Sequence, residues 1–149
     1  MNTLAKTFAV AALIAVSTCT MAAGKPVGDI SKKAVVNLST ADLAIDPYVA
    51  VMTEGQSTGV EQLFTSEFSQ KIQAATDKTN SRREVISLLK KQKGEQLNCK
   101  TNTTIVEQSS NYVVAKVSQQ FEGFTKTDLI TLVNDGGNWK VSQSINSYK

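Results

Sequence analysis

The stretch that decides the fold runs from Asn98 to Lys149, where apolar and polar residues alternate with a period of two. Turn-forming residues interrupt this alternation at Ser109–Asn111, at Gly123 and at Asp135–Asn138. Because links this short cannot carry a parallel crossover, the segments between them should be antiparallel neighbours in one sheet. The expected strands are CKTNTTIVEQ (Cys99–Gln108), YVVAKVSQQFE (Tyr112–Glu122), FTKTDLITLVN (Phe124–Asn134) and WKVSQSINSY (Trp139–Tyr148).

The residues before this stretch predict three helices. The first covers Thr40–Glu54, bends at Pro47 and stops at Gly55. Gly59–Phe64 predicts a short second helix. The third begins at the capping box of Ser81–Glu84, in which the serine and the glutamate satisfy each other's backbone amides, and it runs to Gly94.

Two other segments are less regular. Ala34–Val36 is compatible with one additional short strand, and the period of Glu67–Ala75 is ambiguous and allows extended chain.

The alternation also assigns side chains to the two faces of the sheet. One row carries Val113, Ala115, Val117, Gln119 and Phe121, and the last strand should carry Trp139, Val141, Gln143 and Ile145 on one face. Phe124–Asn134 is apolar on both faces. Either its second face meets another copy of the chain in a homodimer, or a bulge shifts its register midway.

The amino terminus reads as an export signal. Lys6 precedes the apolar run Phe8–Val16, and small residues follow up to Ala22. The apolar run is shorter than the ~20 residues of a membrane span. We therefore expect a signal peptide at 1–22, a flexible leader at 23–33, one domain at 34–149, and a periplasmic or secreted protein with no stable membrane insertion after cleavage. Acylation of Cys19 would anchor the protein to lipid instead.

The composition excludes several classes of function. The chain has 149 residues and no histidine, which removes histidine bases and Ser-His-Asp or Cys-His nucleophiles. Its two cysteines cannot build a CxxC…CxxC zinc site, so no metal is expected. A net charge of +3 is too small to indicate nucleic-acid binding. No Gly-rich phosphate loop is present, and the sequence predicts no cofactor.

Helices followed by an antiparallel meander resemble the nuclear transport factor two-like superfamily. The resemblance is strongest in AIDPY (Ala44–Tyr48), GVEQLF (Gly59–Phe64), NCKT (Asn98–Thr101), FTKT (Phe124–Thr127) and WKV (Trp139–Val141), and it covers Val35–Lys149. These segments look like the lumazine-binding-like branch, which also includes SnoaL-like proteins. The resemblance implies a cone-shaped α+β fold in which three helices pack on a curved antiparallel sheet of four long strands plus a short one.

The same resemblance implies a cavity between the helices and the concave sheet. Ketosteroid isomerases of this superfamily use a first-helix tyrosine with carboxylates, and Tyr48 lies in the matching helix. Asp128 is the one acid deep within an apolar strand, which makes the two residues candidates for a catalytic pair. Alternatively, Asp128 lies at a strand edge or on the outer face and pairs with Lys126 or Lys116. Gln119 and Gln143 interrupt apolar rows, so with Tyr48 and Trp139 they are the predicted ligand-binding residues. The alternative is that the glutamines reach solvent at the ends of the sheet and Trp139 belongs to the core.

Three functions remain open on these residues. The first is an exported, non-enzymatic homodimer that holds a small amphipathic ligand in its cone or serves as an interaction module. The second is a small-molecule isomerase or hydrolase that uses Tyr48 and Asp128. The third is a purely structural or partner-binding module. The missing histidines and the absence of an evident acid–base pair favour the first.

Overall fold

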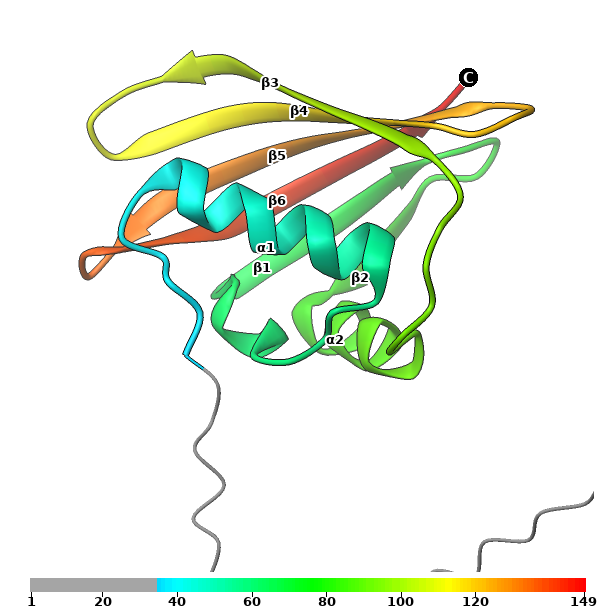
Figure 1. Ribbon diagram of the computed structural model, residues 1–149. Helices are drawn as coiled ribbons and strands as arrows, with labels where there is room; N and C mark the ends of the chain where they lie inside the picture. The colour runs from blue at the N-terminus through cyan, green and yellow to red at the C-terminus, as the bar shows by residue number, and fades with distance from the viewer. Residues whose placement is uncertain (1–34) are drawn as a thin grey trace, which may run out of the picture. The chain divides into compact units, whose positions relative to one another are not determined.

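The computed structural model describes residues 35–149, so the expected signal peptide and leader lie outside the described residues. A curved six-stranded sheet carries the helices on one face (Figure 1). The strand order is β2-β1-β6-β5-β4-β3. The strands are β1 (Phe64–Gln73), β2 (Lys78–Ser81), β3 (Lys100–Gln108), β4 (Tyr112–Gln120), β5 (Thr125–Asp135) and β6 (Asn138–Tyr148).

The carboxy-terminal meander predicted from the sequence is confirmed. β3, β4, β5 and β6 pair in chain order as antiparallel neighbours. The sheet is larger and more mixed than expected, because β1 pairs with β6 in parallel and β2 pairs with β1 antiparallel. The ambiguous segment Glu67–Ala75 thus falls mainly in β1, whereas Val35 and Val36 are not in a strand.

Two of the three predicted helices form. α1 (Ala41–Glu54) is capped by the side chain of Thr40 and contains Pro47. α2 (Arg82–Lys91) begins with the predicted capping box of Ser81 and Glu84.

The predicted second helix is wrong. Val60–Gln62 makes only the single 3-10 turn η1, because Phe64 already belongs to β1 and lies opposite Val141 of β6. The part of the chain that the structure describes therefore holds two α-helices, and neither is both long and apolar enough to cross a membrane.

The core lies between the helices and the inner face of the sheet. α1 contacts β6, and α2 contacts β1 and β2 (Figure 1). Tyr48 and Val51 of α1 and Val85 and Leu89 of α2 are buried against this face. The sheet contributes the fully buried side chains of Val113, Ala115, Ile130, Leu132 and Val141.

Gly55 joins the end of α1 to the chain that follows α2. Its carbonyl oxygen accepts from the Gly94 amide at 3.0 Å, and the carbonyl of Thr53 accepts from the Leu97 amide at 2.7 Å. Gly55 has φ +63°, and a Cβ there would lie 2.6 Å from backbone atoms of Gln92 and Gly94. The left-handed conformation and the close approach both require glycine at this position.

A β-bulge in β6 changes which residues face the core. Thr131 lies opposite Gln143, but Leu132 lies opposite Val141, so Ser142 is an extra residue in β6. Beyond it, Ser144 and Asn146 point inward and Gln143 is exposed. The predicted placement of Gln143 in the row of Trp139 and Val141 is therefore wrong.

The alternative of a bulge within Phe124–Asn134 also needs correction, because the irregularity lies in the partner strand. β5 itself alternates regularly and buries Asp128, Ile130 and Leu132 on its inner face.

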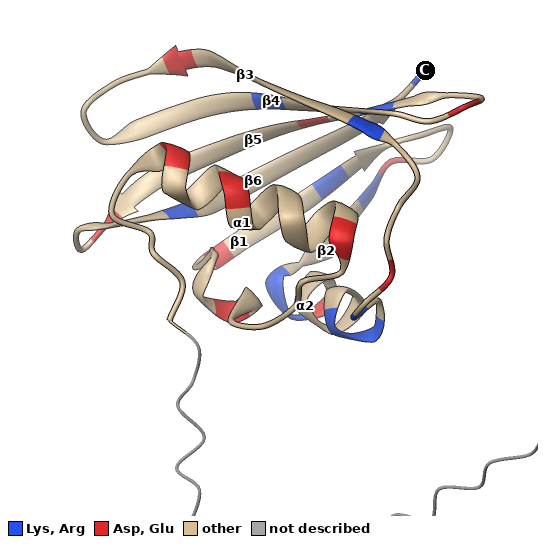
Figure 2. Ribbon diagram, in the orientation of Figure 1, with Lys and Arg blue, Asp and Glu red and all other residues tan. Residues whose placement is uncertain are grey.

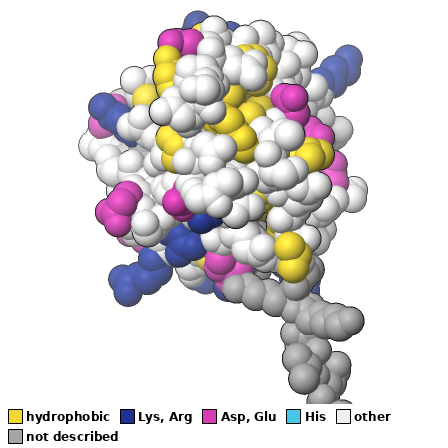
Figure 3. Space-filling model, turned by 90° about the vertical axis from the view of Figure 1, so that its left-hand side faces the viewer, with side chains coloured by type: hydrophobic (Ala, Val, Ile, Leu, Met, Phe, Trp, Pro, Cys, Tyr) yellow, Lys and Arg dark blue, Asp and Glu magenta, His cyan; other side chains and the backbone are white. Residues whose placement is uncertain are grey.

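β3 forms the edge of the sheet farthest from α2, and all nine of its residues are exposed. Ile105 and Val106 are among the exposed large hydrophobic side chains, as is Leu43 of α1. Hydrophobic side chains gather on the upper part of the face seen in Figure 3, which looks onto the left-hand side of Figure 1. The helices thus cover the β2 side of the sheet more completely than the β3 side (Figure 1).

Candidate functional site

The inner face of the sheet changes from apolar to polar along its strands. Toward one end, cross-strand neighbours such as Val113 and Leu132 are apolar and fully buried. Toward the other end, the cross-strand rows also contain polar side chains, several of them buried. In order along the strands, these rows are Ala115–Ile130–Ser144–Gln70–Asn80, Val117–Asp128–Asn146–Ile72–Lys78 and Gln119–Lys126–Tyr148.

Tyr48 and Asp128, the sequence-predicted pair, meet at the start of this polar end. The Tyr48 hydroxyl donates a hydrogen bond to Oδ2 of Asp128. Ser144 Oγ donates to Oδ1 of the same carboxyl group at 2.7 Å, and lies 3.5 Å from the Tyr48 hydroxyl. All three side chains are at most 1% exposed.

Burial governs the protonation of this pair. Desolvation raises the pKa of Asp128 above its ordinary value, although the hydrogen bonds from Tyr48 and Ser144 and the charge of Lys126 oppose this rise. Desolvation, with the charge of Asp128, also raises the pKa of Tyr48 well above its ordinary value. Tyr48 therefore remains a neutral hydrogen-bond donor, and a proton is held more readily on Asp128 than on an exposed carboxylate.

Three buried carboxamides continue the network away from Asp128. With its amide nitrogen toward Asp128, Asn146 donates to Oδ1 at 2.9 Å and to Oδ2 at 3.2 Å, and its oxygen accepts from Gln70 Nε2 at 3.2 Å. Asn80 Nδ2 in turn donates to Gln70 Oε1 at 3.1 Å. This orientation satisfies both neighbours of Asn146 and forms a continuous chain from Asn80 to Asp128.

A cavity of about 300 Å³ adjoins the carboxamides. Gln70, Asn80 and Asn146 line it together with the half-buried Lys126 and the exposed Tyr148. The remaining lining residues are Met52, Ile72, Lys78, Val85, Leu88, Leu89, Gln92 and Leu97. Apolar walls with a few converging polar groups are typical of small-molecule sites, and this volume lies at the lower end of their range.

The predicted site residues are only partly brought together. Tyr48 and Asp128 touch each other, but neither lines the cavity. Gln119 is buried on the same face, and its Oε1 has no hydrogen-bond partner among residues 35–149. Trp139 lies buried near the apolar end, where its amide donates to the carbonyl of Leu38, and Gln143 is exposed.

The cavity-lining carboxamides were missed by the sequence analysis. Uninterrupted alternation from Trp139 would put Asn146 on the outer face, but the bulge at Ser142 reverses the alternation beyond it. Gln70 lies in Glu67–Ala75, the segment whose period is ambiguous, and Asn80 lies directly before the capping box, in a stretch for which no element was predicted. The signal that could have found Gln70 is its place between Phe68 and Ile72 in a period of two, the same kind of polar intrusion that singled out Gln119.

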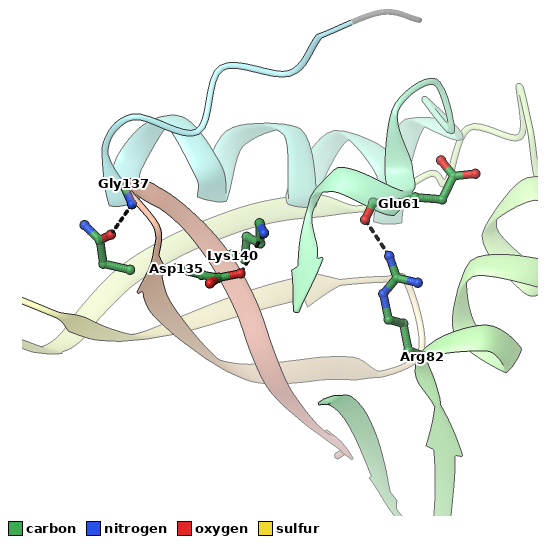
Figure 4. Close-up of polar contacts among 6 residues, drawn as sticks. Glu61, Arg82, Asp135, Gly137 and Lys140 are labelled. Atoms are coloured by element: carbon green, nitrogen blue, oxygen red, sulfur yellow. Dashed lines mark hydrogen bonds and ion pairs between the residues drawn. The ribbon is translucent and has the colours of Figure 1, made fainter. Parts of the chain in front are cut away.

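A second polar cluster lies near η1 and the β5–β6 hairpin (Figure 4). Nη2 of Arg82 donates to the carbonyl of Glu61 at 2.7 Å, while the carboxylate of Glu61 pairs with Lys90. Lys140 and Asp135 form an ion pair at 2.7 Å. These contacts fasten η1 to α2 and the two hairpin strands to each other, so they have a structural role.

Comparisons with known proteins agree with this fold. Residues 37–145 match the family described as "Putative lumazine-binding". An NTF-2-like protein of unknown function from Silicibacter pomeroyi superposes with a TM-score of 0.62 at 17% identity, covering 72% of this chain and 92% of that chain. A search of functionally described proteins gave no match.

Two other solved structures are similar. A protein of unknown function from the DUF3225 family of Pectobacterium atrosepticum gives a TM-score of 0.59 at 16% identity, covering 75% of this chain and 90% of that one. An NTF2-like protein from Cytophaga hutchinsonii gives 0.54 at 16% identity, covering 71% and 95%. At these identities the structures show the fold alone, whereas the family match spans most of the chain. The chain therefore belongs to the putative lumazine-binding family of NTF2-like proteins.

Proposed function

We propose that this protein binds a small amphipathic molecule in the cavity between α2, β1, β2 and β6, without catalysing a reaction on it. The observation that carries the proposal is the buried chain Asn80–Gln70–Asn146, whose three carboxamides also line the cavity. Apolar side chains such as Val85 and Leu89 form the rest of its wall. The family description adds lumazine, a flat heterocycle with polar edges, as a natural first probe.

The energetics of burial support a binding role for the carboxamides. Burying an amide costs free energy unless it is hydrogen-bonded, and packed apolar residues would stabilise this part of the core at lower cost. Carboxamides present donors and acceptors in one plane, which suits the edge of a heterocycle or of another amide. The cavity thus offers a polar side and an apolar side to one ligand.

A second candidate function is isomerisation or hydrolysis by Tyr48 and Asp128, which their direct hydrogen bond favours. A substrate would have to reach two side chains that are fully buried and do not line the cavity. The binding proposal needs no such opening. The two are separated by Tyr48→Phe, which should abolish turnover of a substrate if the pair is catalytic and should leave ligand affinity within about twofold if it is structural.

Export and dimerisation complete the proposal and rest on the sequence. Cell fractionation with mass spectrometry of the mature protein should find a periplasmic or secreted chain that begins at Ala23. Light scattering should find a dimer that uses the outer face of the sheet, where Leu129 of β5 is exposed beside the half-buried Ile145 of β6. A protein retained in the cytoplasm, or a monomer at all concentrations, would contradict these two parts.

The binding proposal is tested by thermal unfolding with lumazine, riboflavin and a panel of aromatic metabolites. A ligand present at ten times its Kd should stabilise the fold by about 1.4 kcal/mol and raise Tm by several degrees. Leu97→Trp should fill the cavity and remove the shift, whereas Leu43→Trp is the matched control, because both leucines are 40% exposed and only Leu97 lines the cavity. A shift that persists in Leu97→Trp would place the ligand elsewhere.

A further inference from the structure

The charges around the cavity are of one sign. Lys78 and Lys126 line it, and no Asp or Glu does. α2, whose Val85 and Leu89 line the cavity, also carries Arg82, Arg83, Lys90 and Lys91 outside the lining, and of these Lys90 pairs with Glu61 (Figure 2). Each of the two lysines has one carboxyl group whose pKa its charge lowers, Glu84 for Lys78 and Asp128 for Lys126. Lys78 is exposed whereas Lys126 is half-buried, so Lys126 is the more important cation of the two.

Lys126 occupies a distinctive position. It is half-buried on the inner face, between the buried Gln119 on β4 and Tyr148 on β6. Among residues 35–149 it forms no ion pair with a carboxylate. Asp128, two residues along the same face, already accepts from Tyr48 and Ser144, is 1% exposed and does not line the cavity. Because no carboxylate in the described part of the chain lies within ion-pair distance of Lys126, an anionic ligand would supply a direct partner for this half-buried side chain.

Three aromatic side chains, those of Tyr148, Phe124 and Phe121, form a cluster near Lys126. Tyr148 lines the cavity, and its ring centroid lies 6.3 Å from that of Phe124. Phe124 stacks on Phe121 with centroids 4.5 Å apart and an interplanar angle of 13°. Phe124 and Tyr148 are 45% and 48% exposed, so their rings retain free surface. Aromatic rings with free faces favour stacking on a second flat ring.

We propose that the natural ligand of this cavity is an aromatic anion, whose charged group pairs with Lys126 and whose ring packs on Tyr148. This inference rests on the proposed binding function and names the chemical class of the ligand. The carboxamides of Gln70, Asn80 and Asn146 bind polar atoms on the opposite edge of the same ring system. A carboxylate, a sulfonate and a deprotonated ring imide share the required chemistry.

The test compares two fluorescent dyes that differ by one charged group. Anilinonaphthalene sulfonate carries a sulfonate on a ring system that phenylnaphthylamine has without the charge. Fluorescence titration at low salt should give a Kd about tenfold lower for the sulfonate. Lys126→Gln should remove that preference, and raising the salt concentration should weaken binding of the sulfonate alone. Each probe is also titrated against Leu97→Trp, which should weaken both dyes.

Lys116→Gln is the matched control. Lys116 is exposed on the outer face of β4 and lines no part of the cavity, so its substitution removes the same charge from the sheet at a distance from the site. It should leave the preference for the sulfonate within about twofold. A similar loss in both variants would show a general effect of net charge and would overturn the role of Lys126.

The remaining outcomes separate this inference from the proposed function. If both dyes bind equally, Lys126→Gln has no effect and Leu97→Trp weakens both, the cavity binds small molecules but the anionic class is wrong. If neither dye binds, or if Leu97→Trp changes neither, the inference is overturned, and the metabolite panel then decides the proposed function by itself.

Discussion

The two ends of the sheet's inner face differ in the polarity of the side chains that they bury. At one end Val113, Leu132 and Val141 are fully buried and apolar, and they hold the helices on the sheet. At the other end the same face buries Asp128 and Asn146, which need hydrogen-bond partners to offset the cost of burial. The apolar end stabilises the fold, and the polar end adjoins the cavity in which we propose that a ligand binds.

The largest expected effect comes from the apolar end. Leu132→Ala removes a fully buried side chain and should lower the free energy of unfolding by about 3 kcal/mol, measured by urea denaturation. Because Leu132 does not line the cavity, the affinity of the folded variant for a ligand should stay within about twofold. A large loss of affinity at a small loss of stability would show that the two ends do not have separate roles.

Gly55, at the end of α1, should be nearly as sensitive to substitution. Gly55→Ala combines an unfavourable φ with a clash against backbone atoms, and should cost about 3 kcal/mol in urea denaturation. Gly136→Ala is the matched control, because its φ of +62° is almost the same and a Cβ there would meet nothing within 4 Å. The control should cost about 1 kcal/mol. Equal losses in both variants would contradict the close approach at Gly55.

The buried pair should respond more weakly. Tyr48→Phe removes one donor to Asp128 and should lower the free energy of unfolding by about 1.5 kcal/mol, because a buried acceptor loses a partner. It should also raise the pKa of Asp128 further, since the hydrogen bond from Tyr48 lowers that pKa. Tyr112→Phe breaks a surface hydrogen bond to Glu107 and should cost less than about 0.5 kcal/mol. A larger loss of stability in Tyr112→Phe than in Tyr48→Phe would contradict the greater contribution of the buried hydrogen bond.

The smallest effect is a dependence on pH. Burial raises the pKa of Asp128 in the folded state, so the folded protein binds more protons than the unfolded chain between the ordinary carboxyl pKa of about 3.9 and the raised value. The contribution of Asp128 to stability should therefore fall as the pH rises through this window and stay constant above it. Asp128→Asn should lack this fall.

The comparison of wild type with Asp128→Asn isolates this carboxyl group. Glu84, whose pKa is lowered mainly by hydrogen bonds with Ser81, acts with the opposite sign in both proteins and cancels in the difference. Urea denaturation between pH 4 and 8 should show the stability of wild type decreasing relative to Asp128→Asn. A constant difference, or one that grows in favour of wild type as the pH rises, would contradict a raised pKa.

The fold was largely predictable from local patterns. The alternation after Asn98 predicted four antiparallel strands, and the capping box at Ser81 predicted the start of α2. The helix expected at Gly59–Phe64 does not form, because Phe64 pairs with β6 and the chain before it makes a single 3-10 turn. The local sequence does not encode this pairing. The parallel pairing of β1 with β6 could not be predicted either, because it joins two segments that lie far apart in the sequence.

The site was predictable only where alternation is regular. Tyr48 and Asp128 were selected from the resemblance and from the parity of β5, and the structure joins them. Gln143 and Asn146 lie on the faces opposite to those that uninterrupted alternation predicts, because one extra residue, Ser142, reverses the alternation of β6. A bulge depends on the pairing of two strands, so it cannot be located from one of them.

The most direct test of the account is a nitrogen-15 NMR titration of the folded protein with a ligand from the metabolite panel. We expect the side-chain amide signals of Gln70, Asn80 and Asn146 to shift with ligand, while the backbone amides of Val113 and Leu132 at the apolar end stay unchanged. Shifts confined to the apolar end or to the outer face of the sheet would contradict a binding site at the polar end.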